Sequence, residues 1–216
     1  MRLDLHCHTR YSGDSLTTLD QLLHRMDRRG LDMVAITDHN TLAGALDFCA
    51  WAPDRFIAGE EIKTQRGELL ALFLEEAVPP GLSLLETISR ARAQGGLVGV
   101  PHPLDRLRSG ALGREVLEEI HGELDFVEAF NARMTFPADN RLAQELAAGW
   151  GLPTSAGSDA HTPFEVGRAY VEMPAFADPR SFLDSLAQGQ IQGRLSSPLV
   201  HLASNYAKWR NRFGAG

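Results

Sequence analysis

Short apolar runs alternate with amphipathic stretches along almost the whole chain, and this alternation limits the fold more than any other feature. The apolar runs predict strands at residues 2–7, 33–37, 56–59, 69–74, 97–100, 126–129, 153–156 and 169–172. The amphipathic stretches predict helices at residues 18–29, 42–50, 83–94, 114–122, 138–149, 178–188 and 199–213. Repeated strand–helix units favour a parallel sheet, and seven or eight such units favour a closed α/β barrel.

The domain organisation predicted from the chain is simple. Its 216 residues are typical of one domain, and it shows no sequence repeat, low-complexity segment or Gly/Ser-rich linker. We therefore expect a single barrel domain over residues 1–216, in which residues 199–213 form a docked C-terminal helix.

Candidate metal ligands follow six of the predicted strands. His6 and His8 close the first strand, where residues two apart project to the same face. The other candidates are Asp14, Asp38, His39, Glu60, Glu61, His102, Asn131, Asp159 and His161. Because the loops at the carboxyl ends of barrel strands converge, we expect these side chains to meet in one pocket.

Imidazole and carboxylate groups without a well-placed pair of thiolates suit Zn, Mn or Fe. Five histidines and the three carboxylates of Asp14, Glu61 and Asp159 would overcrowd one ion, so we expect two or three divalent ions that share ligands. Each motif alone has a simpler interpretation: Asp38 or Asn40 would cap a helix, and His102 would form a rigid turn between two prolines. A shared metal site explains all the motifs at once.

The charge balance argues against a long nucleic acid as partner. Lys and Arg number 21 against 28 Asp and Glu, which gives a net charge of −7, and aromatic residues do not alternate with basic ones. Two cysteines imply no disulfide framework and favour a reducing compartment. Without a signal-like segment or an apolar run of about 18 residues, we expect a cytoplasmic protein that does not enter the membrane.

The motifs resemble those of the PHP superfamily, the polymerase-and-histidinol-phosphatase metal-dependent phosphoesterases. The matching residues, in order, are His6, His8 and Asp14 for the HxH motif, residues 37–39 for TDH, Glu61 for the Gly-x-Glu turn, His102 for the His-Pro pair and residues 158–161 for SDAH. Five motifs in this order, over nearly the whole chain, carry the resemblance.

The resemblance implies a distorted (β/α)7 TIM-like barrel with its ions at the carboxyl ends of the strands. The implied ligand sets are His6, His8, Glu61 and Asp159 for one ion, Glu61 and His102 for a second, and Asp14, His39 and His161 for a third. Two departures concern the second ion. Leu69 and Leu70 stand where relatives carry a fourth-strand histidine, and Asn131, a weak neutral ligand, stands where some carry His or Cys. That ion would be held loosely, complete its shell with water, or be absent.

Barrel, ions and carboxylates together predict a metal-dependent hydrolase, and the resemblance implies that its substrates are phosphate esters, with a metal-bound hydroxide that attacks phosphorus. Glu61 would bridge two ions, and Asp159 or His39 would pass a proton to the departing oxygen. The candidate phosphate-binding residues are Arg133, Arg168 and Arg10, each with the alternative of an ordinary surface arginine.

The spacing of the motifs favours a small substrate. About 40 residues separate Glu61 from His102, which leaves no room for a large inserted domain and favours an open site for a small phosphorylated metabolite or a nucleotide. Residues 105–114, rich in Arg and Gly, are expected to form a loop beside the site. That loop would contact phosphate, cover the pocket or simply face solvent.

Two other functions compete with this prediction. An amidohydrolase-type barrel also opens with HxH and often uses a carboxylated lysine, for which Lys63 is the candidate. A metal-stabilised binding module without activity is the non-enzymatic alternative, and Asn131 in a ligand position gives it some weight. The sequence does not predict an oligomeric state.

Overall fold

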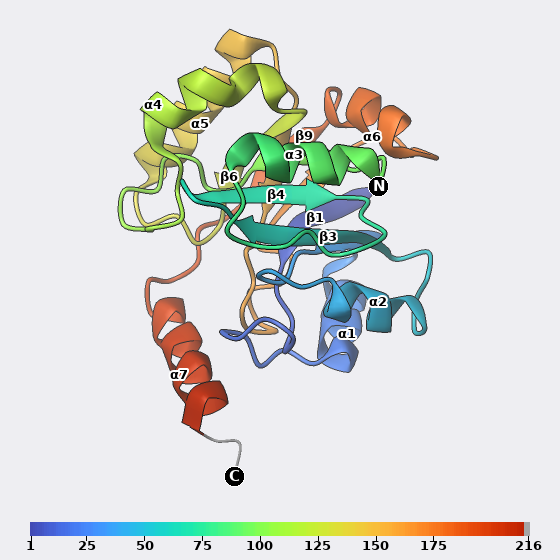
Figure 1. Ribbon diagram of the computed structural model, residues 1–216. Coiled ribbons are helices and arrows are strands. Elements are labelled where there is room, and N and C mark those ends of the chain that lie inside the picture. The colour runs from blue at the N-terminus through green and yellow to red at the C-terminus, as the bar shows by residue number, and fades with distance from the viewer. Residues whose placement is uncertain (214–216) are drawn as a thin grey trace.

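Nine strands form one curved sheet in the computed structural model, which describes residues 1–213 (Figure 1). Along the sheet they follow the order β7-β6-β5-β4-β3-β2-β1-β8-β9. Their bounds are β1 (Arg2–Cys7), β2 (Met33–Ile36), β3 (Phe56–Lys63), β4 (Glu68–Leu72), β5 (Leu97–Val100), β6 (Phe126–Asn131), β7 (Thr154–Gly157), β8 (Ala169–Glu172) and β9 (Gln190–Gly193).

Helices connect most of these strands. Within residues 1–213 they are α1 (Leu19–Arg29), α2 (Ala43–Cys49), α3 (Leu84–Ala93), α4 (Gly113–Ile120), the 3₁₀ helix η1 (His121–Glu123), α5 (Pro137–Trp150), α6 (Pro179–Leu186) and α7 (Val200–Phe213). Local signals explain several helix ends. The Thr18 side chain accepts the N–H of Gln21 in a capping box, and Gly30 ends α1 with a left-handed φ of 64°. Figure 1 shows α7 set apart from the other helices, at the lower left.

Hydrogen bonds between β1 and the chain after β7 nearly close the sheet into a barrel. The Asp159 N–H donates to the His6 carbonyl at 2.7 Å. The buried Asp4 carboxylate accepts the Ser158 and Gly167 N–H groups, both at 2.8 Å. The prediction of an α/β fold built on a distorted barrel is therefore confirmed.

The expectation of a parallel sheet is wrong for two strands, β4 and β8. β4 runs antiparallel to both β3 and β5, and β8 runs antiparallel to β1 and β9. The connection from β3 to β4 contains no helix, and so short a link can only reverse the chain into a hairpin. Pairing with β4 also extends β3 to Lys63, so Glu60 and Glu61 lie inside this strand and not after it. β9 was not predicted.

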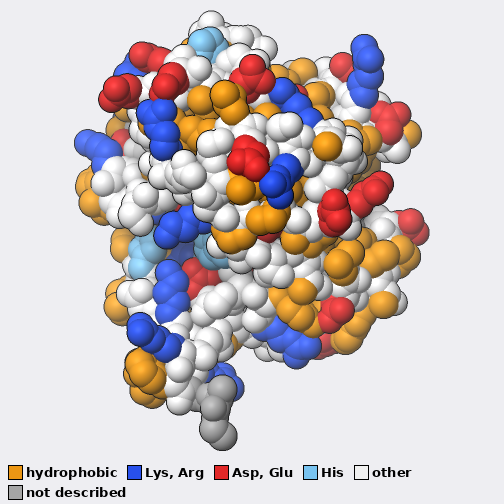
Figure 2. Space-filling model, viewed as in Figure 1, with side chains coloured by type: hydrophobic (Ala, Val, Ile, Leu, Met, Phe, Trp, Pro, Cys, Tyr) orange, Lys and Arg blue, Asp and Glu red, His pale blue; other side chains and the backbone are white. Residues whose placement is uncertain are grey.

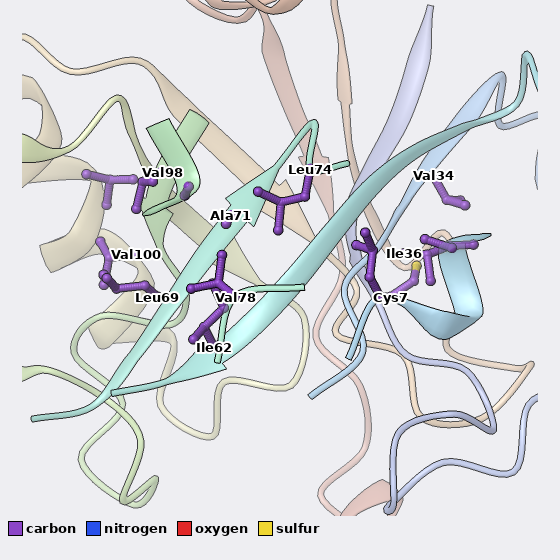
Figure 3. Packing of buried hydrophobic residues seen from close by; sticks show 14 of the residues in the cluster. Cys7, Val34, Ile36, Ile62, Leu69, Ala71, Leu74, Val78, Val98 and Val100 are labelled. Carbon is purple, nitrogen blue, oxygen red and sulfur yellow. The ribbon is translucent and has the colours of Figure 1, made fainter. Parts of the chain in front are cut away.

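Alternate residues of β4 pack into two separate apolar clusters. Leu69 and Ala71 pack in the larger cluster, which Figure 3 shows beside Val98 and Val100 of β5. Leu70 and Leu72 belong to the second cluster, which also contains residues of α6. Because Glu61 pairs with Leu70 and Glu60 pairs with Ala71, the two adjacent acids point to opposite faces of the sheet.

Residues 1–213 contain no helix whose length and hydropathy would let it span a bilayer.

Candidate metal centre

The predicted ligands come together at the carboxyl ends of the strands. They are His6, His8, Asp14, His39, Glu61, His102, Asn131, Asp159 and His161, all buried except the half-buried His39. One carboxylate oxygen, Glu61 Oε2, lies 3.2 Å from His6 Nε2, His8 Nε2 and His39 Nδ1. Three imidazoles from two separate segments, the end of β1 and the loop after β2, thus converge on a single oxygen.

A second gathering of donor atoms lies around Asp14. Its Oδ2 is 3.2 Å from His161 Nε2 and 3.3 Å from His39 Nε2, and His8 completes a four-residue group whose ligand atoms all lie within 4.8 Å of one another. His102 lies on the other oxygen of Glu61, with Nε2 2.7 Å from Oε1. The structure therefore brings together the residues of all three ligand sets.

Buried atoms without partners show that this cluster fits cations. Among the described residues, Asp159 Oδ1 and His102 Nδ1 are buried and have no hydrogen-bond partner. Asp159 Oδ1 lies 3.3 Å from His8 Nε2 and 3.4 Å from His161 Nδ1. A buried carboxylate oxygen among imidazole nitrogens is costly unless a cation or a proton joins them, and nitrogen with oxygen donors suits Zn, Mn or Fe.

The electrostatics agree with a cation site. Burial by itself lowers the pKa of His8, but hydrogen bonds to Asp159 and Glu61 outweigh it and raise that pKa to about 9. Burial raises the pKa of Asp14, yet His161 and His39 hold it well below its usual range. Asp14 is thus held as a carboxylate, and the raised pKa of His8 reflects the attraction of Asp159 and Glu61 for a positive charge, which a bound cation would supply in place of the proton.

Two of the predicted ligands have strained backbone. Four non-glycine residues between 1 and 213 have positive φ, and His102 (29°) and Asp159 (52°) are among them. Such conformations cost about 1–3 kcal/mol each and persist where the surrounding structure enforces them, as at functional sites.

Asn131 lies among the ligands, but protein groups engage both ends of its amide. Its Nδ2 donates to Glu128 Oε2 at 3.0 Å and to Asp159 Oδ2 at 3.2 Å, and its Oδ1 accepts the Arg133 N–H at 2.8 Å. Glu128 was not singled out from the sequence. Its Oε1 lies 3.0 Å from His6 Nδ1, so this buried acid orients a ligand histidine. The sequence signal that could have identified Glu128 is its position as a lone acid inside the apolar run of β6.

The helix-capping interpretation of the second motif is wrong. α2 begins after Leu42, without a side-chain cap. Asp38 instead accepts the N–H and hydroxyl of Thr9, both at 2.6 Å, and Asn40 accepts the N–H of Lys63. These contacts fix the loop that carries His39.

The three candidate phosphate-binding arginines do not all lie near the cluster. Arg133 lines a cavity of about 370 Å³ beside the cluster, whereas Arg10 and Arg168 do not. Two cations that the sequence did not identify line it as well. Arg108 Nη2 lies 2.6 Å from Asp159 Oδ2, and Lys208 Nζ lies 3.3 Å from Asp14 Oδ2. The Arg-rich composition of residues 105–114 was the only signal for Arg108.

Glu68 is a further residue that was overlooked. It opens β4, the strand in which a histidine was sought, and forms a candidate ion group with His39 and Glu61. Its Oε2 lies 3.9 Å from His102 Nε2, on the side of Glu61 where the second ion was predicted.

Figure 2 shows the mouth of this site as a hollow in which histidine, basic and acidic side chains gather above α7. A nearly closed barrel with buried histidines and carboxylates at its carboxyl end defines a metal-binding α/β-barrel protein. The PHP domain pattern matches residues 4–124, and a second pattern, described as PHP-associated, matches residues 137–191. The chain belongs to the PHP family, as its motifs predicted.

Relatives agree with this assignment. The uncharacterized protein MJ0417 of Methanocaldococcus jannaschii is 35% identical over 232 aligned residues, which cover 100% of this chain and 90% of that protein. A two-domain protein of Bacteroides vulgatus, described as containing a predicted PHP-like metal-dependent phosphoesterase, has a TM-score of 0.71 at 19% identity. The match covers 90% of this chain and 65% of that one, so this chain spans less than two thirds of that neighbour.

A third neighbour is described as an amidohydrolase of Chromobacterium violaceum with bound sulfate and no metal. Its TM-score is 0.64 at 18% identity, over 87% of this chain and 97% of that one. At this identity both solved structures show the shared fold alone.

Proposed function

We propose that the protein is a metal-dependent hydrolase of small phosphate esters, with two or three Mn, Zn or Fe ions. The observation that carries the proposal is the position of the ligand cluster. It lines an open cavity of about 370 Å³ into which Arg108 and Lys208 also project. Cations beside a metal site suit an anionic substrate such as phosphate.

The ions would lie in two gatherings of ligand atoms joined by Glu61. One gathering is formed by His6, His8, Glu61 and Asp159, and the other by Asp14, His39 and His161 with His8 shared. His102 and Glu68 lie on the far oxygen of Glu61. Bound ions would supply Lewis acidity and an activated water at neutral pH.

Two residues of the cluster were expected to move protons. Burial opposes ionisation of Asp159, but Arg108 and His6 hold its pKa well below the usual range. Asp159 is therefore a carboxylate that suits holding an ion, and so weak a base is a poor proton carrier, contrary to the role first expected for it. His39 is the half-exposed member of the cluster and lines the cavity, but it also belongs to the second gathering of ligands, so a water molecule in the open cavity would donate to the departing oxygen in its place.

The experiment combines elemental analysis with two chromogenic esters. In added manganese, the protein should hydrolyse p-nitrophenyl phosphate faster than bis-p-nitrophenyl phosphate. His8→Ala and Asp159→Ala should each reduce turnover at least a thousandfold while the circular dichroism stays near that of the wild type. The exposed His24→Ala is the matched control and should retain full activity.

Hydrolysis of neither ester by protein with stoichiometric metal would contradict the proposal and favour an amidohydrolase or a binding module. The structure adds no support to the amidohydrolase alternative, because Lys63 is exposed at the end of β3 and does not line the cavity.

A further inference from the structure

Helix α7 forms one wall of the cavity beside the metal centre. His201, Ser204, Asn205 and Lys208, all on α7, line it together with the loop around Arg108. The floor includes Asp14, His39 and His161, which belong to the ligand cluster. The helix that follows the last strand therefore lies across the cavity from the ligand cluster.

Arg133 ties this helix to the site. Its Nη2 donates to Ser204 Oγ at 2.6 Å and to the Val200 carbonyl at 3.1 Å. Its Nη1 lies 2.5 Å from His161 Nδ1, and its Nε lies 3.2 Å from Glu165 Oε1. Because hydrogen-bond contacts hold both terminal nitrogens and the guanidinium forms an ion pair with Glu165, Arg133 serves chiefly as a tether and leaves anion binding to other cations.

Lys208 and Arg108 are the cations that remain available to a substrate. The Lys208 side chain is 62% exposed, and it forms an ion pair with Asp14. Arg108 is 21% exposed and contacts Asp159 through Nη2. They come from different segments, α7 and the loop before α4, and Figure 2 shows basic side chains on both sides of the hollow. An anionic group above the ligand cluster would lie between them.

The remaining lining is polar and offers hydroxyl and amide groups, from Ser109, Thr135, Ser204 and Asn205. Among the described residues that line the cavity there is no Phe, Tyr or Trp, and Leu107 is its large apolar member. Proteins usually hold nucleobases by stacking on aromatic rings or on free guanidinium planes. Here Arg133 is tied to α7 and to Glu165, Arg108 is paired with Asp159, and two of the three lining histidines, His39 and His161, belong to the ligand cluster. His201 is then the aromatic ring of the lining that lies outside the ligand cluster, so the cavity offers little surface on which a base could stack.

We propose that α7 is the substrate-recognition wall and that the substrate is a small hydroxyl-rich phosphate monoester without a nucleobase, such as a sugar or polyol phosphate. Lys208 binds its anionic oxygens, and Asn205 binds a hydroxyl of its leaving group. This inference rests on the proposed function, because it names the substrate class of the same site.

The first test compares two substrates that differ by a base, ribose 5-phosphate and adenosine 5′-monophosphate, with manganese-loaded full-length protein. We expect kcat/KM to be at least tenfold higher for ribose 5-phosphate. Equal or better hydrolysis of the nucleotide would overturn the inference while leaving the proposed function intact. If p-nitrophenyl phosphate and both other esters remained unhydrolysed, the proposed function itself would fail.

The second test replaces residues of the wall. Lys208→Gln should raise the calorimetric Kd for inorganic phosphate at least tenfold without loss of bound metal, and Lys208→Arg should restore it. Asn205→Ala should lower kcat/KM for ribose 5-phosphate at least fivefold and change p-nitrophenyl phosphate hydrolysis less than twofold. The exposed Arg212→Gln on the same helix is the control. Unchanged phosphate affinity in Lys208→Gln, or equal losses on both esters in Asn205→Ala, would overturn the assignment.

Discussion

Glu128 illustrates how one buried residue orients a metal centre. Its carboxylate lies 3.0 Å from His6 Nδ1 and accepts the His102 N–H at 2.6 Å and the Asn131 amide at 3.0 Å. By holding Nδ1 of His6, it leaves Nε2 as the nitrogen directed at Glu61. Carboxylate–histidine pairs of this kind fix the tautomer and raise the basicity of a ligand.

Glu128→Gln should therefore weaken metal binding by about 10–100-fold, the usual effect of losing such a partner. Competition with a fluorescent chelator measures the affinity directly and does not depend on turnover. Glu118→Gln, a replacement of an exposed acid on α4, should leave the affinity unchanged. Equal affinities for the Glu128→Gln variant and the wild type would show that His6 needs no such support.

Glu60, the neighbour of the bridging glutamate, lies in a very different environment. It is fully buried on the opposite face of β3, accepts the Val78 N–H at 2.9 Å and has no partner for Oε1 among the described residues. Burial raises its pKa from 4.5 to about 7, with the Val78 N–H opposing the shift. Raising the pKa of an acid means that folding favours its protonated form, so ionisation destabilises the protein.

We expect Glu60→Gln and the wild type to be equally stable below about pH 4.5, where the acid is protonated in both the folded and unfolded states. As the pH rises through 7, the wild type should lose about 1–3 kcal/mol relative to the variant. Urea unfolding between pH 4 and 9 measures the difference. Glu75→Gln, at an exposed position in the following loop, is the control. A difference that did not grow with pH would contradict this account.

Among the elements, the seam between β1 and β7 determines whether the ligands meet. Gly157 ends β7 at this seam, and a Cβ built there would lie 2.2 Å from His6 Cβ and 2.6 Å from Glu128 Oε1. Only a glycine allows the two strands to approach so closely.

Gly157→Ala should force β7 away from β1, lower the free energy of unfolding by about 1–3 kcal/mol and weaken metal binding, since His6 must shift. Gly149→Ala is the matched control in α5, where a Cβ meets nothing within 4 Å. That change should stabilise the protein by about 0.5–1 kcal/mol, because alanine favours a helix. Thermal unfolding and chelator competition measure both variants, and a neutral Gly157→Ala would mean that the seam can relax.

The element pattern was largely predictable because it is local. Six of the eight expected strands begin at the expected residue. The helices expected from residues 18, 83 and 178 do start there, and the side chain of Thr18, Ser83 or Asp178 caps each of them. The direction of β4 was not predicted, because it depends on the absence of a helix between two adjacent apolar runs. β9 was missed because its four residues, QIQG, are largely exposed and carry little apolar signal.

At the scale of the whole molecule, the barrel concentrates buried charge that cations would neutralise. Ions that bind only the folded state stabilise it by mass action, by about 2.7 kcal/mol at a hundredfold excess over Kd. For a chain of this size, manganese added to metal-free protein should raise Tm by roughly 5–10 °C. His8→Ala should show a smaller shift in the same scan. A wild-type Tm that does not respond to manganese or to a chelator would contradict a structural role for the ions.

The candidate site was predictable where its ligands follow the ends of predicted strands. His6, His8 and Asp159 come together because parallel strands bring their carboxyl ends to one rim, whereas Glu61 reaches them from inside β3. Asn131 was predicted as a ligand from its position alone. The contacts of its amide with Glu128, Asp159 and Arg133 depend on side-chain geometry that no spacing reveals.

The sequence by itself determined the strand–helix order, the family and the set of imidazoles and carboxylates at the rim, because each of these follows from local spacing. Tertiary structure alone decided that Arg108 and Lys208 face the cavity while Arg133 ties α7 to it. The latter contact joins residues 71 positions apart, and the contact of Lys208 with Asp14 spans almost the whole chain. Such pairs depend on how the loops and the last helix pack on the folded barrel, and a local sequence pattern does not predict that packing.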